Sequence, residues 1–161
     1  MRLGDLLVKK GALTPEQRDA VLEAQAGSSR PFGAIAEGMF GVHPRAVEEA
    51  WGEQYAEFAG EADPRTTDIS GEVLALIDKR QAWQFAVIPM ELSDDGELLV
   101  VTSPRHLARA MRFTGWRLDR PSRFAICTND ALVLGLGKHY PMDAVDPGAI
   151  TQLMGHLIDA A

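Results

Sequence analysis

Near its start the chain reads Arg2-Leu3-Gly4-Asp5-Leu6-Leu7-Val8-Lys9-Lys10-Gly11-Ala12-Leu13-Thr14-Pro15-Glu16-Gln17. When the sequence is shifted by 29 residues, its first part aligns with itself. In this alignment a glycine, a proline and a glutamine each match a residue of the same type, and the apolar positions match as well. Two unrelated helical segments would share the apolar positions but not these three residues. The matched pairs are Gly4 with Gly33, Leu6 with Ile35, Leu13 with Val42, Pro15 with Pro44, Leu22 with Trp51 and Gln25 with Gln54.

Each copy of this repeat predicts two short helices. In the first copy, apolar residues recur at helical spacing up to Gly11, and a glycine at that place typically ends a helix. Thr14 and, in the second copy, His43 each precede a proline, which is the pattern of a capped second helix. Residues 1–58 are therefore predicted to form a tandem helical repeat of two helix pairs. A plain four-helix pack without a ligand is the alternative.

The remainder of the chain predicts a small α/β domain. Residues 59–70 are polar and contain glycine and proline, which indicates a linker. Residues 71–141 then show the order ββαβα, so the expected fold class is α+β. The expected elements are a helix over 72–79, strands over 85–92, 97–102 and 123–128, a helix over 105–114 ended by Gly115, a helix from Asn129 to about 138, and a helix over 149–159 in a C-terminal tail, 142–161.

Composition excludes several classes of function. Sixteen Lys and Arg against 23 Asp and Glu give a net charge of −7, which disfavours wholesale binding of nucleic acid. No run of apolar residues is long enough to span a membrane, and the first residues lack the apolar stretch of a signal peptide. Cys127 is the single cysteine, so no internal disulfide can form. These features predict a cytoplasmic protein.

The sequence contains no recognisable catalytic or metal-binding motif. The chain has no glycine-rich phosphate loop ending in Lys-Ser or Lys-Thr. Cys127 lies in an apolar strand pattern, which favours a buried structural cysteine over a nucleophile. The histidines, 43, 106, 139 and 156, have no metal-ligand spacing. We therefore expect no catalytic residues, no metal and no cofactor.

A cluster of arginines stands out from the acidic background. Residues 105–123 contain six arginines and a single acid, Asp119. Arg105, Arg109 and Arg112 are spaced to share one face of a helix. Such a local basic surface suits an acidic protein partner. A merely solvated helix face is the alternative.

The stretch 2–17, followed by Gln25, resembles the first motif of MshEN domains, which are the N-terminal domains of type II secretion and type IV pilus assembly ATPases (GspE N-terminal domains). Residues 99–104 and 138–140 are similar to the α/β half of that family, so the resemblance covers about residues 2–141. It implies a stand-alone or truncated bacterial member, since no ATPase domain follows. The implied function is a non-catalytic regulatory or protein-interaction module that docks on a partner in a secretion or pilus machine.

The resemblance also implies an alternative function, because some members bind cyclic di-GMP between their paired motifs. Arginine can clamp a phosphate or stack on guanine, glycine lets backbone amides approach phosphates, and glutamine can bond a base edge. The residues to which this role carries over are Arg2, Leu3, Gly4, Gly11, Gln25, Arg30, Gly33 and Gln54.

The second copy departs from the family motif. Pro31 and Phe32 replace Arg-Leu, and the nearest arginine, Arg30, comes one residue early. Phe40 occupies the usual glycine position. In the first copy, Arg18 replaces an expected leucine. These departures weaken the case for a nucleotide receptor and favour the docking function.

Overall fold

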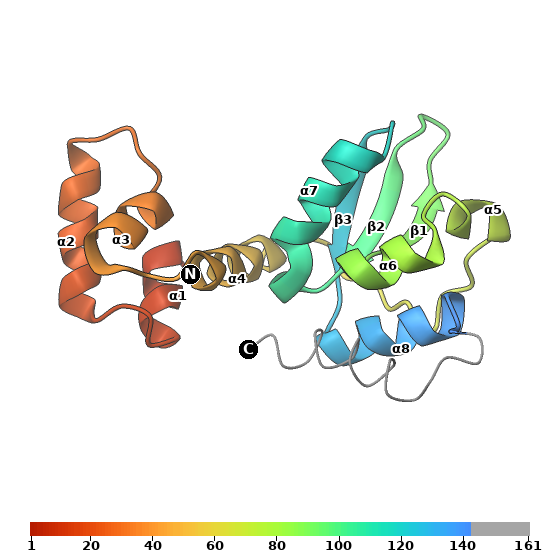
Figure 1. The fold of residues 1–161 in the computed structure, drawn as a ribbon, viewed down its shortest axis with the longest axis horizontal. Helices are drawn as coiled ribbons and strands as arrows, with labels where there is room; N and C mark the ends of the chain where they lie inside the picture. Colours follow the sequence, from red (N-terminus) through yellow and green to blue (C-terminus); the bar gives the residue numbers. More distant parts are fainter. Residues whose placement is uncertain (143–161) are drawn as a thin grey trace. The chain divides into compact units, whose positions relative to one another are not determined.

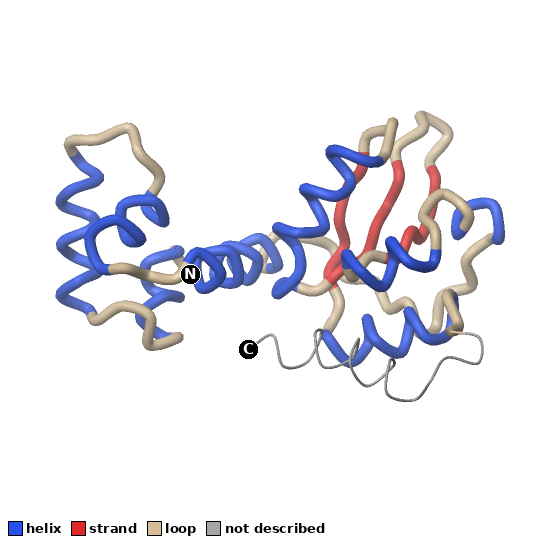
Figure 2. Tube along the Cα trace, in the orientation of Figure 1, coloured by secondary structure: helices blue, strands red, loops and turns tan. Residues whose placement is uncertain are grey.

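The structure, a computed structural model, describes residues 1–142 (Figure 1). The chain divides into two compact units, Met1–Phe58 (unit 1) and a second that begins at Ala59 (unit 2). The fold class is α+β, as predicted: unit 1 is helical, and the described part of unit 2 combines helices with one sheet (Figure 2). The tail helix expected over 149–159 lies outside the described residues.

Unit 1 consists of α1 (Leu3–Lys9), α2 (Pro15–Ala26), α3 (Phe32–Phe40) and α4 (Pro44–Ala56). The starts of α1 and α3 are separated by 29 residues, and so are the starts of α2 and α4. The most extensive contacts join α2 to α3 and α1 to α4. The first helix of each copy therefore packs mainly on the second helix of the other copy.

Side-chain caps begin the two longer helices at the predicted residues. Thr14 Oγ1 accepts a hydrogen bond from the Gln17 amide at 3.1 Å, and Gln17 Oε1 accepts one from the Thr14 amide at 2.9 Å. This reciprocal pair satisfies two amides that the helix cannot bond. His43 Nδ1 accepts from the Arg45 amide at 3.1 Å. Both predicted caps are confirmed.

The two shorter helices end at glycines in the left-handed conformation. Gly11 has φ 73°, and Gly41 has φ 64°, a region that glycine enters without steric cost. Because α3 continues through Phe40, its terminating glycine comes one residue later than the 29-residue shift places it. The second copy has therefore not lost its helix-ending glycine: α3 extends through Phe40, and Gly41 ends it as Gly11 ends α1.

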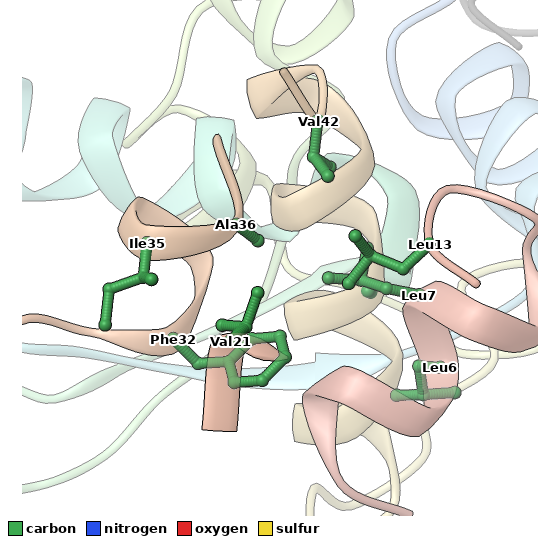
Figure 3. Close-up of a cluster of buried hydrophobic side chains, with 9 residues drawn as sticks. Leu6, Leu7, Leu13, Val21, Phe32, Ile35, Ala36 and Val42 are labelled. Carbon is green, nitrogen blue, oxygen red and sulfur yellow. The ribbon is translucent and has the colours of Figure 1, made fainter. Parts of the chain in front are cut away.

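The core of unit 1 is made of side chains that correspond under the same shift (Figure 3). Four pairs are buried at both positions, and Phe32 is buried opposite Leu3, which packs partly against the core. The buried pairs are Leu6 with Ile35, Leu7 with Ala36, Leu13 with Val42 and Val21 with Ala50. Phe40 also packs against this cluster. The repeat seen in the sequence is therefore a repeat of core positions.

Unit 2 contains α5 (Gly71–Leu74), α6 (Lys79–Phe85), β1 (Ile88–Leu92), β2 (Leu98–Thr102), the 3-10 turn η1 (Pro104–His106), α7 (Leu107–Arg117), β3 (Ser122–Ile126) and α8 (Asn129–His139). The strands lie in the order β1-β2-β3. The β1–β2 pair is antiparallel, with a register shift between Pro89 and Glu91, and the β2–β3 pair is parallel. The predicted order ββαβα is present from β1 onward, preceded by two short helices.

Three predicted boundaries in unit 2 are wrong for local reasons. The helix expected over 72–79 is split, because Asp78 and Gln81 form a capping box that starts α6. Phe85 consequently ends a helix instead of opening a strand, and the chain turns at Ala86, whose φ is 53°. Gly115 does not end α7, which continues to Arg117.

Residues 59–70, expected as a linker, are bonded to the rest of unit 2. Glu61 forms a parallel bridge with Ile126. His139 Nε2 lies 2.7 Å from the Pro64 carbonyl oxygen, and Gly135 of α8 is so close to Pro64 that an added Cβ would come within 2.7 Å of that ring. This close approach explains why a glycine stands at position 135 within the helix.

Candidate functional site

The start of α1 carries three of the residues expected to bind a ligand. Arg2 is exposed and precedes the helix, and its carbonyl oxygen accepts hydrogen bonds from the Asp5 and Leu6 amides at 3.1 Å. Leu3 packs partly against the core. Gly4 is buried, and a Cβ added there would come within 2.9 Å of the Phe32 ring. One side of Gly4 is therefore filled by protein instead of being open to a phosphate.

Arg18, the departure from the expected leucine, lies over the same glycine. An added Cβ at Gly4 would come within 3.0 Å of Arg18 Cγ. The Arg18 guanidinium bonds Asp19 Oδ1 at 2.8 Å and Asp5 Oδ1 at 3.0 Å, and these carboxylates raise its pKa. The positive charge that Arg18 adds near the start of α1 is thus matched by neighbouring acids.

The start of α3 carries a second group. Gln25 Nε2 donates a long hydrogen bond, 3.5 Å, to the Arg30 carbonyl oxygen. Arg30 Nη2 donates to the Ala34 carbonyl oxygen at 3.4 Å. Gly33 is buried, and an added Cβ would clash with Val47 Cγ1. Gln25, from the end of the first copy, therefore lies beside the head of the second copy.

Ion pairs between α1 and α4 show how the two helices run relative to one another. The terminal ammonium of Met1 lies 2.6 Å from Glu57 Oε2, and Lys10 Nζ lies 2.5 Å from Glu53 Oε1 and 4.0 Å from Glu49 Oε2. The two helices therefore run in opposite directions. Gln54, close to Glu57 in sequence, lies toward the end of α4 that faces the start of α1.

The predicted ligand residues consequently fall into two spatial groups. Arg2, Leu3 and Gly4 lie at the end of the α1–α4 pair that Gln54 approaches, and Arg30 and Gly33 lie with Gln25. Gly11 joins neither group, since it follows the opposite end of α1, is exposed and has no atom near its missing Cβ. Its role is to end the helix.

The arginines expected to bind a partner lie in unit 2, on two elements. Arg105 is in η1 and partly exposed, whereas Arg109 and Arg112 are exposed on α7. The expectation of one continuous helix is therefore wrong for Arg105. The Arg109 guanidinium carbon lies 5.7 Å from the centre of the Phe85 ring, and that ring stacks on Phe113 at 4.4 Å.

Trp116 is not among the residues that the sequence predicts to bind a partner. Its side chain is 87% exposed near the end of α7. Position 116 continues the spacing of Arg109 and Arg112, so the helical periodicity of the arginine cluster could have pointed to it. A large exposed aromatic side chain among arginines has the composition of an interaction surface.

Neither a reactive thiol nor a metal centre is seen in the described part of the chain. Burial, the largest cause, raises the pKa of Cys127 to about 12, so the thiol stays protonated at neutral pH. Residues 1–142 contain no group of three or more His, Cys, Asp or Glu side chains placed to hold a metal ion. No helix among these residues is long and apolar enough to cross a membrane.

The chain belongs to the MshEN domain family, whose model matches residues 55–146, more than half of its length. The match begins at the end of α4 and takes in the described part of unit 2, whereas the tandem repeat precedes it. No curated protein matches the chain.

Two solved structures are similar to the chain. One, described as "Structure of MshE with cdg", is 22% identical, covers 87% of this chain and 99% of its own, and has a TM-score of 0.50. The other, the N-terminal domain of XpsE, is 16% identical, covers 86% of this chain and 93% of its own, and has a TM-score of 0.47. At this level of identity the likeness to MshE shows the fold alone.

Proposed function

We propose that this chain is a cytoplasmic, non-catalytic regulatory module that docks on an acidic surface of a protein partner in a secretion or pilus system. The basic surface of η1 and α7 carries the proposal: Arg105 lies in η1, and Arg109 and Arg112 lie on α7 with the exposed Trp116, in a chain whose net charge is −7. Membership of the MshEN family supports the kind of system. The raised pKa of Cys127 supports the absence of thiol chemistry.

Charge reversal tests the docking. We expect Arg109→Glu/Arg112→Glu to abolish co-purification with a pilus or secretion component from the same organism and to leave the melting temperature nearly unchanged. Arg45→Glu/Arg80→Glu changes the net charge equally at exposed arginines elsewhere and serves as the control. Association that survives the α7 reversal would mean that the arginines form only a solvated face.

We also propose that the two helix pairs of unit 1 are copies related by an approximate two-fold axis. The matched core pairs support this relation, and so do the reciprocal α1–α4 and α2–α3 contacts. Gly4 and Gly33 support it further, because each packs against the residue at the fourth position of the next helix, Arg18 and Val47. The motif residues of both copies other than Gly11 then gather at the two helix starts described above.

Cyclic di-GMP is the second candidate function, favoured by one observation: the MshE structure, whose fold this chain shares, holds cdg. We expect Arg2 to contribute most, since Pro31 at the matched position has no side-chain donor. A charge-assisted hydrogen bond contributes about 1.5–3 kcal/mol. Its loss in Arg2→Ala should weaken binding about 10- to 100-fold.

Calorimetric titration with cyclic di-GMP decides this candidate, with Arg45→Ala as the control for an exposed arginine outside both groups. Equal binding by the wild type and Arg2→Ala would contradict a site at the start of α1. Failure of the wild-type chain to bind would remove the receptor function and leave the docking function in place.

A further inference from the structure

The exposed face of α7 carries a stripe of three large side chains. Arg109, Arg112 and Trp116 stand at positions i, i+3 and i+7, which lie on one side of a helix. Trp116 is 87% exposed and Met111, one residue before Arg112, is 36% exposed. Tryptophan and arginine are the residues that contribute most often to the binding energy of protein interfaces.

The opposite face of α7 holds this stripe in a fixed place. Leu107, Ala110 and Phe113 are buried on it, and Phe113 stacks on Phe85 with an angle of 10° between the rings. Arg109 lies over the same Phe85 ring, which restricts its side chain before any partner arrives. A restricted side chain loses less conformational entropy on binding.

In unit 1, α2 presents a stripe of opposite charge with the same spacing. Glu16, Asp19 and Glu23 also stand at i, i+3 and i+7, and all three are exposed. Asp19 bonds Arg18, whereas neither Glu16 nor Glu23 forms an ion pair within residues 1–142. Beside them Leu22 is 43% exposed, which gives the acidic stripe an apolar contact of its own.

We propose that the α7 face of one chain binds the α2 face of a second copy of this chain. Arginines would lie against the carboxylates, and Trp116 would cover Leu22. The two stripes match in spacing and in charge, and both combine an exposed apolar side chain with charged neighbours. Each chain carries both faces, α2 in unit 1 and α7 in unit 2.

This inference goes beyond the proposed function because it names a different occupant for the α7 face. A second copy and an acidic partner would compete for Arg109 and Arg112. Self-association is measured on the purified chain, whereas docking is measured with the partner, so either can fail alone. Nucleic acid and anionic membranes suit the arginines as well, but the net charge of −7 disfavours them.

Sedimentation velocity on the full chain tests the proposal. We expect the sedimentation coefficient to rise with protein concentration across roughly 10–100 µM, the behaviour of a small polar interface. NaCl at about 0.5 M should weaken the association by screening the exposed charges. Trp116→Ala should weaken it about tenfold or more and leave the melting temperature unchanged, since the side chain is exposed.

A charge swap identifies the two faces. Glu16→Arg/Glu23→Arg reverses only α2, and Arg109→Glu/Arg112→Glu reverses only α7, so each variant alone should remain monomeric. In an equimolar mixture the reversed faces attract one another and the association should return. Asp94→Arg/Asp95→Arg, in the exposed turn between β1 and β2, changes the net charge as much as the α2 reversal and should self-associate like the wild type.

Three results would overturn the proposal: a wild-type chain that stays monomeric over the whole concentration range, single-face reversals that associate like the wild type, or a mixture that stays monomeric. Circular dichroism of each variant confirms its fold before its association is interpreted.

Discussion

In unit 1, each buried core side chain except Phe32 has a buried counterpart 29 residues away, whereas the buried side chains of unit 2 gather on a three-stranded sheet. Positions outside this buried core do not correspond in the same way. Arg2 corresponds to Pro31, and Arg18 corresponds to Val47, which is partly buried. The two copies therefore share their buried core positions, whereas the heads of the two copies differ in chemistry. The family model matches the other unit.

The comparison predicts that core damage stays within one unit. Leu7 is fully buried in unit 1, and Leu132 is fully buried in unit 2. Leu7→Ala should destabilise unit 1 by about 2–5 kcal/mol, because it removes apolar contacts and leaves a cavity. Native-state hydrogen exchange should show lost protection in α1–α4 and unchanged protection in the sheet. Leu132→Ala should do the converse.

If either substitution lowers the protection of both units equally, the two units unfold together and the comparison fails. A substitution at an exposed position, such as Glu72→Ala, gives the baseline for each unit.

A second prediction concerns the two buried glycines of the repeat. Gly33→Ala drives a methyl group into Val47, and overpacking of this kind costs about 1–3 kcal/mol. Gly4→Ala should cost less, because the flexible Arg18 side chain provides part of its contact and can move. Urea denaturation of unit 1 measures both.

Val47→Ala added to Gly33→Ala provides the control, since it opens the space that the new methyl group needs. If the double variant is no more stable than the sum of its single effects predicts, the clash with Val47 is not the cause.

A third prediction ranks the two caps. Thr14→Ala removes the Oγ1 that accepts from the Gln17 amide, but keeps the backbone amide that donates to Gln17 Oε1, and should destabilise unit 1 by about 1 kcal/mol. His43→Ala removes the Nδ1 that accepts from the Arg45 amide and should have a smaller effect, because histidine is not among the residues that cap helices most strongly. Thr14→Ser keeps the hydroxyl and should restore most of the stability in the same denaturation experiment. An equal loss in the serine variant would show that the methyl group of Thr14 matters instead.

The smallest effect is expected in unit 2, at the ion pair that Asp63 forms with Arg65. Hydrogen bonds from Arg65 lower the pKa of Asp63 to about 2 from its ordinary value of 3.8. A lowered pKa means that the charged form stabilises the folded state. Its contribution is present above pH 4 and is lost as the pH falls toward 2.

Acid titration of the chain, followed by the exposure of the buried Trp83 in unit 2, measures this contribution. Asp63→Asn should be less stable than the wild type near neutral pH, and the difference should shrink as the pH falls toward 2, because Asp63 is then increasingly protonated in the folded state. A difference that does not change with pH would show that the amide disturbs the fold by itself.

Much of this architecture can be predicted from the sequence, because the signals are local. The caps at Thr14 and His43 require only an accepting side chain three or fewer residues before the amide that donates to it, and the approximate places of the strands along the chain follow from the pattern of apolar runs. The helix expected over 72–79 was wrong because Asp78 starts a new helix there. A capping residue inside an apolar pattern is easily missed when periodicity alone is considered.

The candidate site was harder to predict, since its grouping depends on which helices pack together. Gln25 belongs to the same copy of the repeat as Arg2, but the structure places it beside Arg30 of the second copy. Gly11 shares a motif with Gly4 and yet lies at the other end of α1. A sequence motif therefore predicts which residue types are present, but it does not predict which of them lie together in the folded unit.

The reciprocal pairing of helices in unit 1 has a consequence for the order of folding. The helices α2 and α3 are joined by a short loop, so their contact closes at little entropic cost. The contact of α1 with α4 closes a much longer loop and needs both copies to be present. We expect the central pair to form first and α1 to dock last. During synthesis α1 is made first, and it must wait without its partner helix until α4 has left the ribosome.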